Sequence, residues 1–233
     1  YIFQGTRGTG KTSAAKILSR AVNCLHPING NPCNECENCK SILNESSLDV
    51  VEMDAASNNG VDDIRELKEK VIYPPQSLKY KVYIIDEGHM LSKGAFNALL
   101  KILEEPPRHL IFILATTEIE KIPATILSRS QKYNFKRISI EKISENLKKI
   151  TELEGKSCDD EVFNLIAKSS DGAMRDALSV LDQLLTKNKD HIKLEDVMEV
   201  LGISSSELLF NLSEALIEKN VNESLLAIDE IYK

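Results

Sequence analysis

The segment that most constrains this chain is residues 5–12, Gly-Thr-Arg-Gly-Thr-Gly-Lys-Thr, which matches the phosphate-binding pattern G-x-x-x-x-G-K-[ST] at every fixed position. An apolar segment (1–3) precedes it and a segment with helical spacing (11–23) follows it, which is the context that the pattern requires. Loop amides and a helix N-terminus attract the oxygens of a polyphosphate. We therefore expect nucleotide phosphates to contact Gly5, Thr6, Arg7, Gly8, Thr9, Gly10, Lys11, Thr12 and Ser13.

Two side chains of this loop have a defined chemistry. We expect Lys11 to reach the β- and γ-phosphates and to take part in catalysis, and we expect the Thr12 hydroxyl to ligate Mg²⁺. The alternative is a glycine-rich surface turn that matches the pattern by chance, which the flanking strand and helix disfavour.

Two carboxylates, Asp86 and Glu87, end the continuous apolar run 82–85. Acidic residues at the carboxyl end of a parallel strand lie at the edge of the sheet where ligands bind. We expect Asp86 to hold Mg²⁺ through water and Glu87 to position an attacking water. Such a pair is also typical of an ordinary turn or helix start, but here it follows a phosphate loop. His89 is expected to be solvated or to cap a helix, with a switch as the alternative.

Strand-like and helix-like segments alternate over the first 135 residues. The predicted strands are 1–3, 49–53, 82–85, 110–115 and 131–135, and the predicted helices are 11–23, 61–71 and 92–104. This alternation predicts the α/β class, with a parallel sheet covered by helices on both faces.

No strand is predicted after residue 135. The amphipathic helices predicted there are 141–154, 160–169, 173–186, 194–201, 206–218 and 222–232. The sequence therefore predicts three parts: a nucleotide-binding domain (1–137), a helical domain (138–202) and the start of a further helical domain (203–233).

Four of the five cysteines lie within residues 24–39, in the order Cys24-x8-Cys33-x2-Cys36-x2-Cys39. Four thiolates at this spacing fill the tetrahedron that Zn²⁺ prefers, so no position is left for water and the metal would be structural. It would order an insert too polar to form its own core. An iron–sulfur cluster and free thiols are the alternatives. Cys158 stands alone and is expected to be incidental.

Charge and composition exclude several classes of protein. The 233 residues carry 29 Lys+Arg and 36 Asp+Glu, a net charge of −7, so the chain is not a basic nucleic-acid-binding protein overall. A hydrophobic fraction of 42% excludes intrinsic disorder. No apolar run of about 20 residues and no signal peptide is present, and the clustered cysteines suit the reducing cytosol, so we expect a cytoplasmic protein without membrane contact. Because the chain opens on Tyr1, inside a predicted strand, it is treated as a fragment.

Several motifs occur together in one order: the phosphate loop, the four-Cys insert, Asp86-Glu87-Gly88-His89, Ala115-Thr116-Thr117, Ser128-Arg129 and Gly172-x-x-Arg175-Asp176-Ala177. Further matching segments are 54–57, 104–107 and 181–183. Over nearly the whole chain this pattern resembles the γ/τ subunit family of bacterial DNA polymerase III, which is the ATPase of the sliding-clamp loader in the AAA+ class.

The resemblance implies roles for residues that spacing alone does not assign. The fold would be an AAA+ domain with a zinc-binding insert, followed by a helical lid and the start of a helical collar. Thr117 resembles the sensor-1 position, and Arg175 resembles sensor 2, which contacts the γ-phosphate. Arg129 resembles the arginine finger that reaches the ATP of a neighbouring subunit. From spacing alone, a surface or interdomain ion pair would be favoured for both arginines.

The resemblance also implies cofactors and partners. ATP, Mg²⁺ and Zn²⁺ would be bound, and the subunit would work in a hetero-oligomeric ring that loads the sliding clamp on primed DNA within the polymerase holoenzyme. The alternative is a non-hydrolysing structural subunit of the same complex. The intact Gly10-Lys11-Thr12 and Asp86-Glu87 segments count against that alternative, because a scaffold does not need them.

Overall fold

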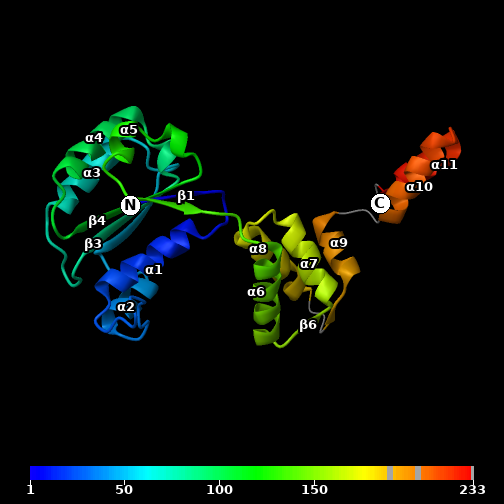
Figure 1. The fold of residues 1–233 in the computed structure, drawn as a ribbon, viewed down its shortest axis with the longest axis horizontal. Helices are drawn as coiled ribbons and strands as arrows, with labels where there is room; N and C mark the ends of the chain where they lie inside the picture. The colour runs from blue at the N-terminus through cyan, green and yellow to red at the C-terminus, as the bar shows by residue number, and fades with distance from the viewer. Residues whose placement is uncertain (188–190, 203–205, 232–233) are drawn as a thin grey trace. The chain divides into compact units, whose positions relative to one another are not determined.

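A computed structural model gives the structure of residues 1–187, 191–202 and 206–231 (Figure 1). The chain divides into two compact units, Tyr1–Arg137 and Ile138–Lys233. The elements of the first unit are β1 (Ile2–Gly5), α1 (Lys11–Asn23), α2 (Glu37–Leu43), β2 (Val50–Asp54), α3 (Val61–Val71), β3 (Lys81–Asp86), η1 (Gly88–Met90), α4 (Lys93–Glu104), β4 (Leu110–Thr116), η2 (Ile119–Lys121), α5 (Ala124–Leu127) and β5 (Lys132–Phe135).

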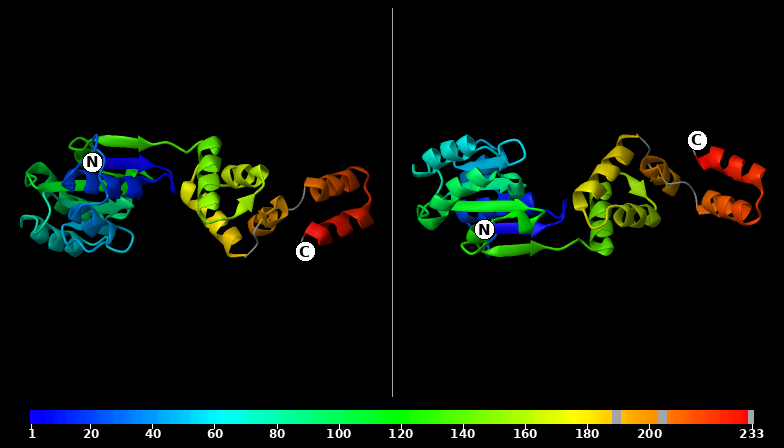
Figure 2. Two further views of the ribbon diagram at one scale, coloured as in Figure 1. Left: turned by 90° about the horizontal axis from the view of Figure 1, so that it is seen from below. Right: turned by 90° about the horizontal axis from the view of Figure 1, so that it is seen from above.

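The first unit is built on a parallel sheet of five strands in the order β2-β3-β4-β1-β5, which confirms the predicted fold class. Figure 2 shows β5 (green) beside β1 (blue), with the register Ile2↔Lys132 to Gly5↔Phe135. Because all strands are parallel, the carboxyl ends of β1, β3 and β4 meet at one edge. The phosphate loop and the two carboxylates follow strands that end at this edge.

Helices bury both faces of this sheet. Strand β3 alternates between two apolar cores: Val82 and Ile84 face the core that contains Ala15 of α1. Tyr83 and Ile85 face the larger core, which contains residues of α3 and α4. A strand buried on both faces needs a continuous apolar run, as the sequence 82–85 has.

The insert between α1 and β2 is more ordered than its polar sequence suggests. It contains the helix α2, which the sequence analysis did not predict, and it buries Cys39 and Ile42 of that helix. Cys36 precedes α2, and its Sγ accepts a hydrogen bond from the backbone N–H of Cys39. The cysteine spacing thus also supplies the N-cap of the helix.

The second unit is mainly helical. Its elements are α6 (Ile140–Leu153), β6 (Ser157–Cys158), α7 (Asp160–Ser169), α8 (Met174–Thr186), β7 (His191–Ile192), α9 (Leu194–Leu201), α10 (Ser206–Ile217) and α11 (Val221–Ile231). The expectation that no strand follows residue 135 is wrong, since β6 and β7 pair in parallel. Two-residue strands are too short to show a period in the sequence.

Helices α6 to α9 share one apolar core that includes Leu147, Phe163 and Leu181. Helices α10 and α11 contact each other. The predicted boundary between 202 and 203 falls at residues 203–205, which lie outside the described residues. Among the described residues, none of the helices has the length and apolar character needed to cross a bilayer.

Candidate functional site

The phosphate loop joins β1 to α1, and its first residue must be glycine. Gly5 pairs with Phe135 of β5, and its backbone has φ +155°. A Cβ at Gly5 would lie 2.3 Å from the carbonyl oxygen of Phe135, well inside van der Waals contact. The close approach of two backbones therefore fixes the start of the loop.

The end of the loop opens helix α1. Gly10 precedes the helix with φ 89°, in the left-handed region, and no side chain caps the first turn. The first amide N–H groups of α1 are therefore left for a bound anion. The structure buries Thr9, half-buries Gly5, Gly8 and Thr12, and leaves exposed Thr6, Arg7, Gly10 and Ser13.

Lys11 lies folded against its own loop. Its side chain is buried, with 6% of the residue exposed, and Nζ donates to the carbonyl oxygens of Gly5 at 2.9 Å and Thr6 at 3.0 Å. Burial lowers the pKa of Lys11, while the nearby carboxylates Glu87 and Asp86 oppose the shift. The ammonium thus lies against two carbonyl oxygens and near two carboxylates.

The hydroxyl of Thr12 joins the loop to β3. Thr12 Oγ1 donates to Asp86 Oδ2 at 2.8 Å, although 74 residues separate the two in the sequence. The other oxygen, Asp86 Oδ1, accepts from the backbone N–H of Glu87 at 2.9 Å. The Thr12 hydroxyl and the Asp86 carboxylate are hard oxygen donors of the kind that Mg²⁺ prefers, so the two residues predicted to hold this ion are adjacent.

Glu87 occupies a strained backbone position at the end of β3, with φ 46°. A non-glycine residue in this left-handed region costs energy, and such positions cluster at functional sites. The Oε2 atom of Glu87 accepts a hydrogen bond from Thr117 Oγ1 at 3.1 Å. The residue predicted to position water and the residue resembling sensor 1 are therefore in direct contact.

His89 is neither solvated nor a helix cap, so that expectation is wrong. Its side chain is only 7% exposed. Nδ1 lies 3.1 Å from Thr116 Oγ1, and Nε2 lies 3.1 Å from Glu118 Oε1. The partners come from the end of β4 and the turn after it, which local sequence around residue 89 does not indicate. The only sequence signal was the Asp-Glu-x-His spacing.

The two predicted arginines lie at exposed positions, Arg129 in the first unit and Arg175 in the second. Arg129 Nη1 donates to the carbonyl oxygen of Thr125 at 2.9 Å, and Nη2 lies 3.4 Å from Glu104 Oε1. Arg175 belongs to the first turn of α8, and its carbonyl accepts from Ser179 Oγ at 3.0 Å.

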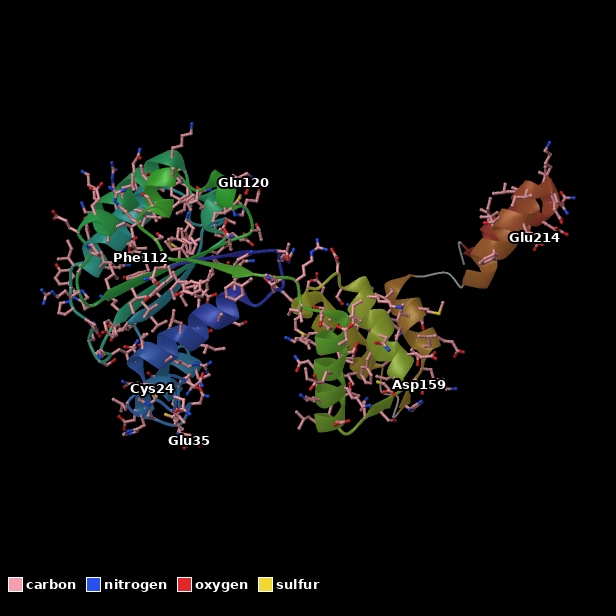
Figure 3. The ribbon with its side chains drawn as sticks, viewed as in Figure 1. Cys24, Glu35, Phe112, Glu120, Asp159 and Glu214 are labelled. Carbon is pink, nitrogen blue, oxygen red and sulfur yellow. The ribbon has the colours of Figure 1, made fainter. Side chains whose placement is uncertain are left out.

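The four clustered cysteines converge on one point. Cys24, labelled in Figure 3, directly follows α1. The Sγ atoms of Cys24, Cys33, Cys36 and Cys39 lie within 4.8 Å of one another, and Cys24 and Cys33 approach to 3.5 Å. A tetrahedral Zn²⁺ with bonds of about 2.3 Å sets its sulfurs about 3.8 Å apart. The donor set and its dimensions therefore fit a four-thiolate metal site.

Backbone amides prepare these thiols for a metal. The N–H of Cys33 donates to Cys24 Sγ, and the N–H of Cys36 donates to Cys33 Sγ. Hydrogen bonds from the amides of Leu25 and Cys39 lower the pKa of Cys36 to about 6, whereas burial raises that of Cys39 to about 12. A bound cation would favour the thiolate of Cys39 as well.

Asn23, the last residue of α1, anchors this cluster to the sheet. Its Oδ1 accepts from the N–H of Tyr80 at 2.8 Å, and its Nδ2 donates to the carbonyl of Tyr80 at 3.1 Å. Its own carbonyl accepts from Asn38 Nδ2 at 2.8 Å. The insert is therefore fixed at the end of α1 that lies away from the phosphate loop.

Two family profiles match the chain. The family described as "DNA polymerase III, delta subunit" matches residues 1–139, and "DNA polymerase III clamp loader subunit, ATPase lid domain" matches residues 142–189.

Curated relatives match nearly the whole chain. DNA polymerase III subunit tau of Bacillus subtilis is 53% identical over 231 residues, which are 99% of this chain and 41% of the relative. The tau subunit of Escherichia coli is 41% identical over 230 residues, 99% of this chain and 36% of the relative. The gamma subunit of Buchnera aphidicola is 41% identical, over 100% of this chain and 64% of the relative. The chain thus spans about two fifths of the length of the two tau relatives.

A solved structure supports the fold. The RuvB Holliday junction branch migration motor of Thermotoga maritima superposes with a TM-score of 0.60 at 18% identity, covering 93% of this chain and 68% of that one. At this identity the likeness concerns the fold alone, and it agrees with the predicted α/β fold.

Proposed function

The chain belongs to the gamma/tau family of DNA polymerase III clamp-loader subunits, and from this premise we propose that it is the ATP-binding and ATP-hydrolysing part of such a subunit. The observation that carries the proposal is the meeting of three groups at one edge of the sheet. They are Lys11 in the loop, the Thr12–Asp86 contact and the Glu87–Thr117 contact.

Each of these residues has a role that its chemistry supports. Loop amides and Lys11 would hold the phosphates, with Nζ exchanging its carbonyl partners for phosphate oxygens. Thr12 and Asp86 would hold Mg²⁺, which when bound neutralises charge on the phosphates. Glu87 would orient the attacking water and accept its proton, while the Thr117 hydroxyl fixes the carboxylate.

The arginines would complete the site from outside the loop. We assign Arg129 to the ATP of a neighbouring subunit and Arg175 to the γ-phosphate, since transfer of a phosphoryl group needs cations on the developing charge. These roles rest on family membership, because the structure gives Arg129 a local partner, Glu104. The division into residues 1–137, 138–202 and 203–233, as ATPase, lid and start of the collar, is proposed on the same ground.

The cysteine cluster is proposed to hold one structural Zn²⁺. Four thiols whose Sγ atoms lie within 4.8 Å of one another fit the closed coordination of a structural site, and amide hydrogen bonds already favour thiolate at Cys24 and Cys36. The ion would order the insert and take no part in hydrolysis.

The proposed setting is a cytoplasmic ring of clamp-loader subunits that uses ATP to place a sliding clamp on primed DNA. The test is ATP turnover by the full-length protein, alone and with partner subunits, clamp and primed DNA, together with the amount of clamp loaded. Turnover that rises on assembly with DNA is expected, and it should disappear in Lys11→Ala. Clamp loading that proceeds equally with Lys11→Ala would instead identify a non-hydrolysing structural subunit.

A further inference from the structure

His89 is a buried polar ring in contact with groups on three sides. Besides Thr116 and Glu118, it approaches Glu87, whose Oε2 lies 3.4 Å from Nδ1. Burying an imidazole is favourable only when its nitrogens have partners, and here both nitrogens have them. No step of the proposed hydrolysis uses this ring.

His89 contacts the residues on either side of Thr117 in the sequence. The imidazole of His89 contacts both Thr116 and Glu118. These two residues are also joined to each other, because the N–H of Glu118 donates to Thr116 Oγ1 at 3.1 Å. Thr117 itself donates to Glu87 Oε2. The ring, the end of β4 and the carboxylate at the end of β3 therefore form a closed circuit of polar contacts.

The turn that carries His89 lies tightly against β4. Gly88 is buried, and a Cβ there would approach Leu114 Cδ2 to 3.2 Å. The ring is thus held by close packing of its own turn as well as by its hydrogen bonds, so its position is determined independently of a ligand.

From this arrangement we propose that His89 is a positioning residue for ATP hydrolysis. Its Nδ1 contacts both the Glu87 carboxylate and the Thr116 hydroxyl. In this way it keeps Glu87 and Thr117 at the separation at which Thr117 donates to the carboxylate. The inference rests on the proposed ATPase function. Removing the ring leaves the loop that binds phosphates untouched, so the loss falls on turnover and not on affinity.

Two substitutions separate the two sides of the ring. The amide of Asn places a polar atom where Nδ1 stands, and the longer Gln places one near Nε2. His89→Asn therefore preserves the polar contacts with Glu87 and Thr116, whereas His89→Gln preserves the contact with Glu118. The proposal assigns the positioning role to the Nδ1 contacts with Glu87 and Thr116.

The experiment measures kcat, KM and the dissociation constant of ATP for full-length protein assembled with its partner subunits and primed DNA. His89→Ala is expected to lower kcat by about tenfold to a hundredfold, as misplacement of a catalytic group does, with ATP affinity changed by less than about twofold. His89→Asn should recover most of kcat, and His89→Gln should recover little. His109→Ala is the matched control, since the His109 side chain is half-buried and its Nε2 bonds the Val71 carbonyl oxygen, at 3.1 Å.

A second measurement covers the case in which His89→Ala folds poorly. In a Thr117→Val background, where the carboxylate has lost the Thr117 hydroxyl with which His89 is proposed to align it, the difference in kcat between His89→Asn and His89→Gln should shrink. The proposal is overturned if His89→Ala turns over ATP like wild type, or if Gln restores kcat as well as Asn does. Absence of turnover in the wild-type assembly would instead defeat the proposed function, and this inference with it.

Discussion

Thr117 Oγ1 donates a hydrogen bond to Glu87 Oε2 at 3.1 Å, so the end of β4 holds the carboxylate at the end of β3. Substitution of Thr117 by Val removes the donor while keeping the shape, and substitution by Ser keeps it. We expect Thr117→Val to lower kcat with little change in ATP affinity, and Thr117→Ser to retain most of kcat. Steady-state kinetics of the assembled protein check this, and equal rates for both variants would contradict it.

Glu87→Gln should separate binding from hydrolysis. The amide keeps the size of the side chain but cannot accept a proton from water, so kcat should fall by about 10²- to 10⁴-fold. The affinity for ATP should stay unchanged, because the carboxylate acts on water and not on the phosphates. Wild-type turnover by this variant would show that Glu87 is not the base.

Lys11→Ala should abolish useful binding of ATP. The ammonium can make at least two charge-assisted hydrogen bonds to phosphate, each worth about 1.5–3 kcal/mol, so the affinity should fall by at least about a hundredfold. Fluorescent-nucleotide titration measures it. Lys16→Ala is the matched control on the same helix, because Lys16 Nζ pairs with Glu45 and Glu52 instead of facing the loop.

In the proposed role, Arg129 would leave Glu104 to reach a neighbouring subunit. Their contact of 3.4 Å is half exposed and therefore worth only about 0–1 kcal/mol, so it is easily broken. Arg129→Ala should spare ATP binding and cut assembly-stimulated turnover by about 10³-fold. Glu104→Gln should keep turnover at or above the wild-type rate.

Mixing two inactive variants tests whether Arg129 acts on a neighbour. Arg129→Ala protein keeps Lys11, and Lys11→Ala protein keeps Arg129, so mixed interfaces contain one complete site. Turnover should return in mixed assemblies. If the mixture stays as inactive as either variant although assembly is confirmed, the role of Arg129 in a neighbouring site is refuted.

Cys36→Ser should lower the zinc content of the protein without affecting nucleotide binding. Elemental analysis of protein purified under reducing conditions should give one zinc per chain for wild type and much less for the variant, while the affinity for ATP is retained. Cys158→Ser, outside the cluster, should keep its zinc. Iron in the wild type, or no metal at all, would contradict the assignment.

Asp49 should make stability depend on pH. Its carboxylate is fully buried and accepts hydrogen bonds from the N–H groups of Gln76, Ser77 and Leu78. Burial raises the pKa of Asp49, but these hydrogen bonds outweigh it and lower the pKa below its ordinary value of 3.8. The pKa of Asp49 is lower in the folded protein than in the unfolded chain, so the ionised carboxylate stabilises the fold. This stabilisation is complete above the ordinary pKa of 3.8 and is lost as the pH falls from there through the pKa of the folded protein.

Asp49→Asn should therefore destabilise the fold at neutral pH, by about 1.5–3 kcal/mol, the value of hydrogen bonds to a charged group. The amide turns its own N–H groups toward the backbone donors. Thermal unfolding between pH 3 and 7 measures the effect, and the gap between wild type and variant should narrow toward the acid end. Asp62→Asn, at an exposed carboxylate, serves as the control.

The sequence predicted the features that depend on residues close together along the chain. The strand at Val82–Ile85 was predicted because a continuous apolar run is needed on a doubly covered strand. The clustering of the cysteines was predicted because the four residues lie within one short segment. Helices α1 and α3 were predicted with their observed ends, Lys11–Asn23 and Val61–Val71. The apolar residues of the first recur at helical spacing, and the second starts with acidic residues and stops before Pro74-Pro75.

What the sequence did not predict depends on residues that meet only after folding. His89 looked solvated because its partners, Thr116 and Glu118, lie on another strand end. Helix α2 was missed because its cysteines and polar residues mask its period, and β6 and β7 because each is two residues long. Spacing alone favoured an ion pair for Arg129, but its partner Glu104 was not identified, because the two residues come from different elements.

The contact between Gly5 and Phe135 has a mechanical consequence. β5 is the last strand of the first unit, and Phe135 stands two residues before that unit ends at Arg137. A shift of the Phe135 backbone would therefore press directly on the first glycine of the phosphate loop. The phosphate loop and the last strand of its unit are thus joined through their backbones at Gly5 and Phe135.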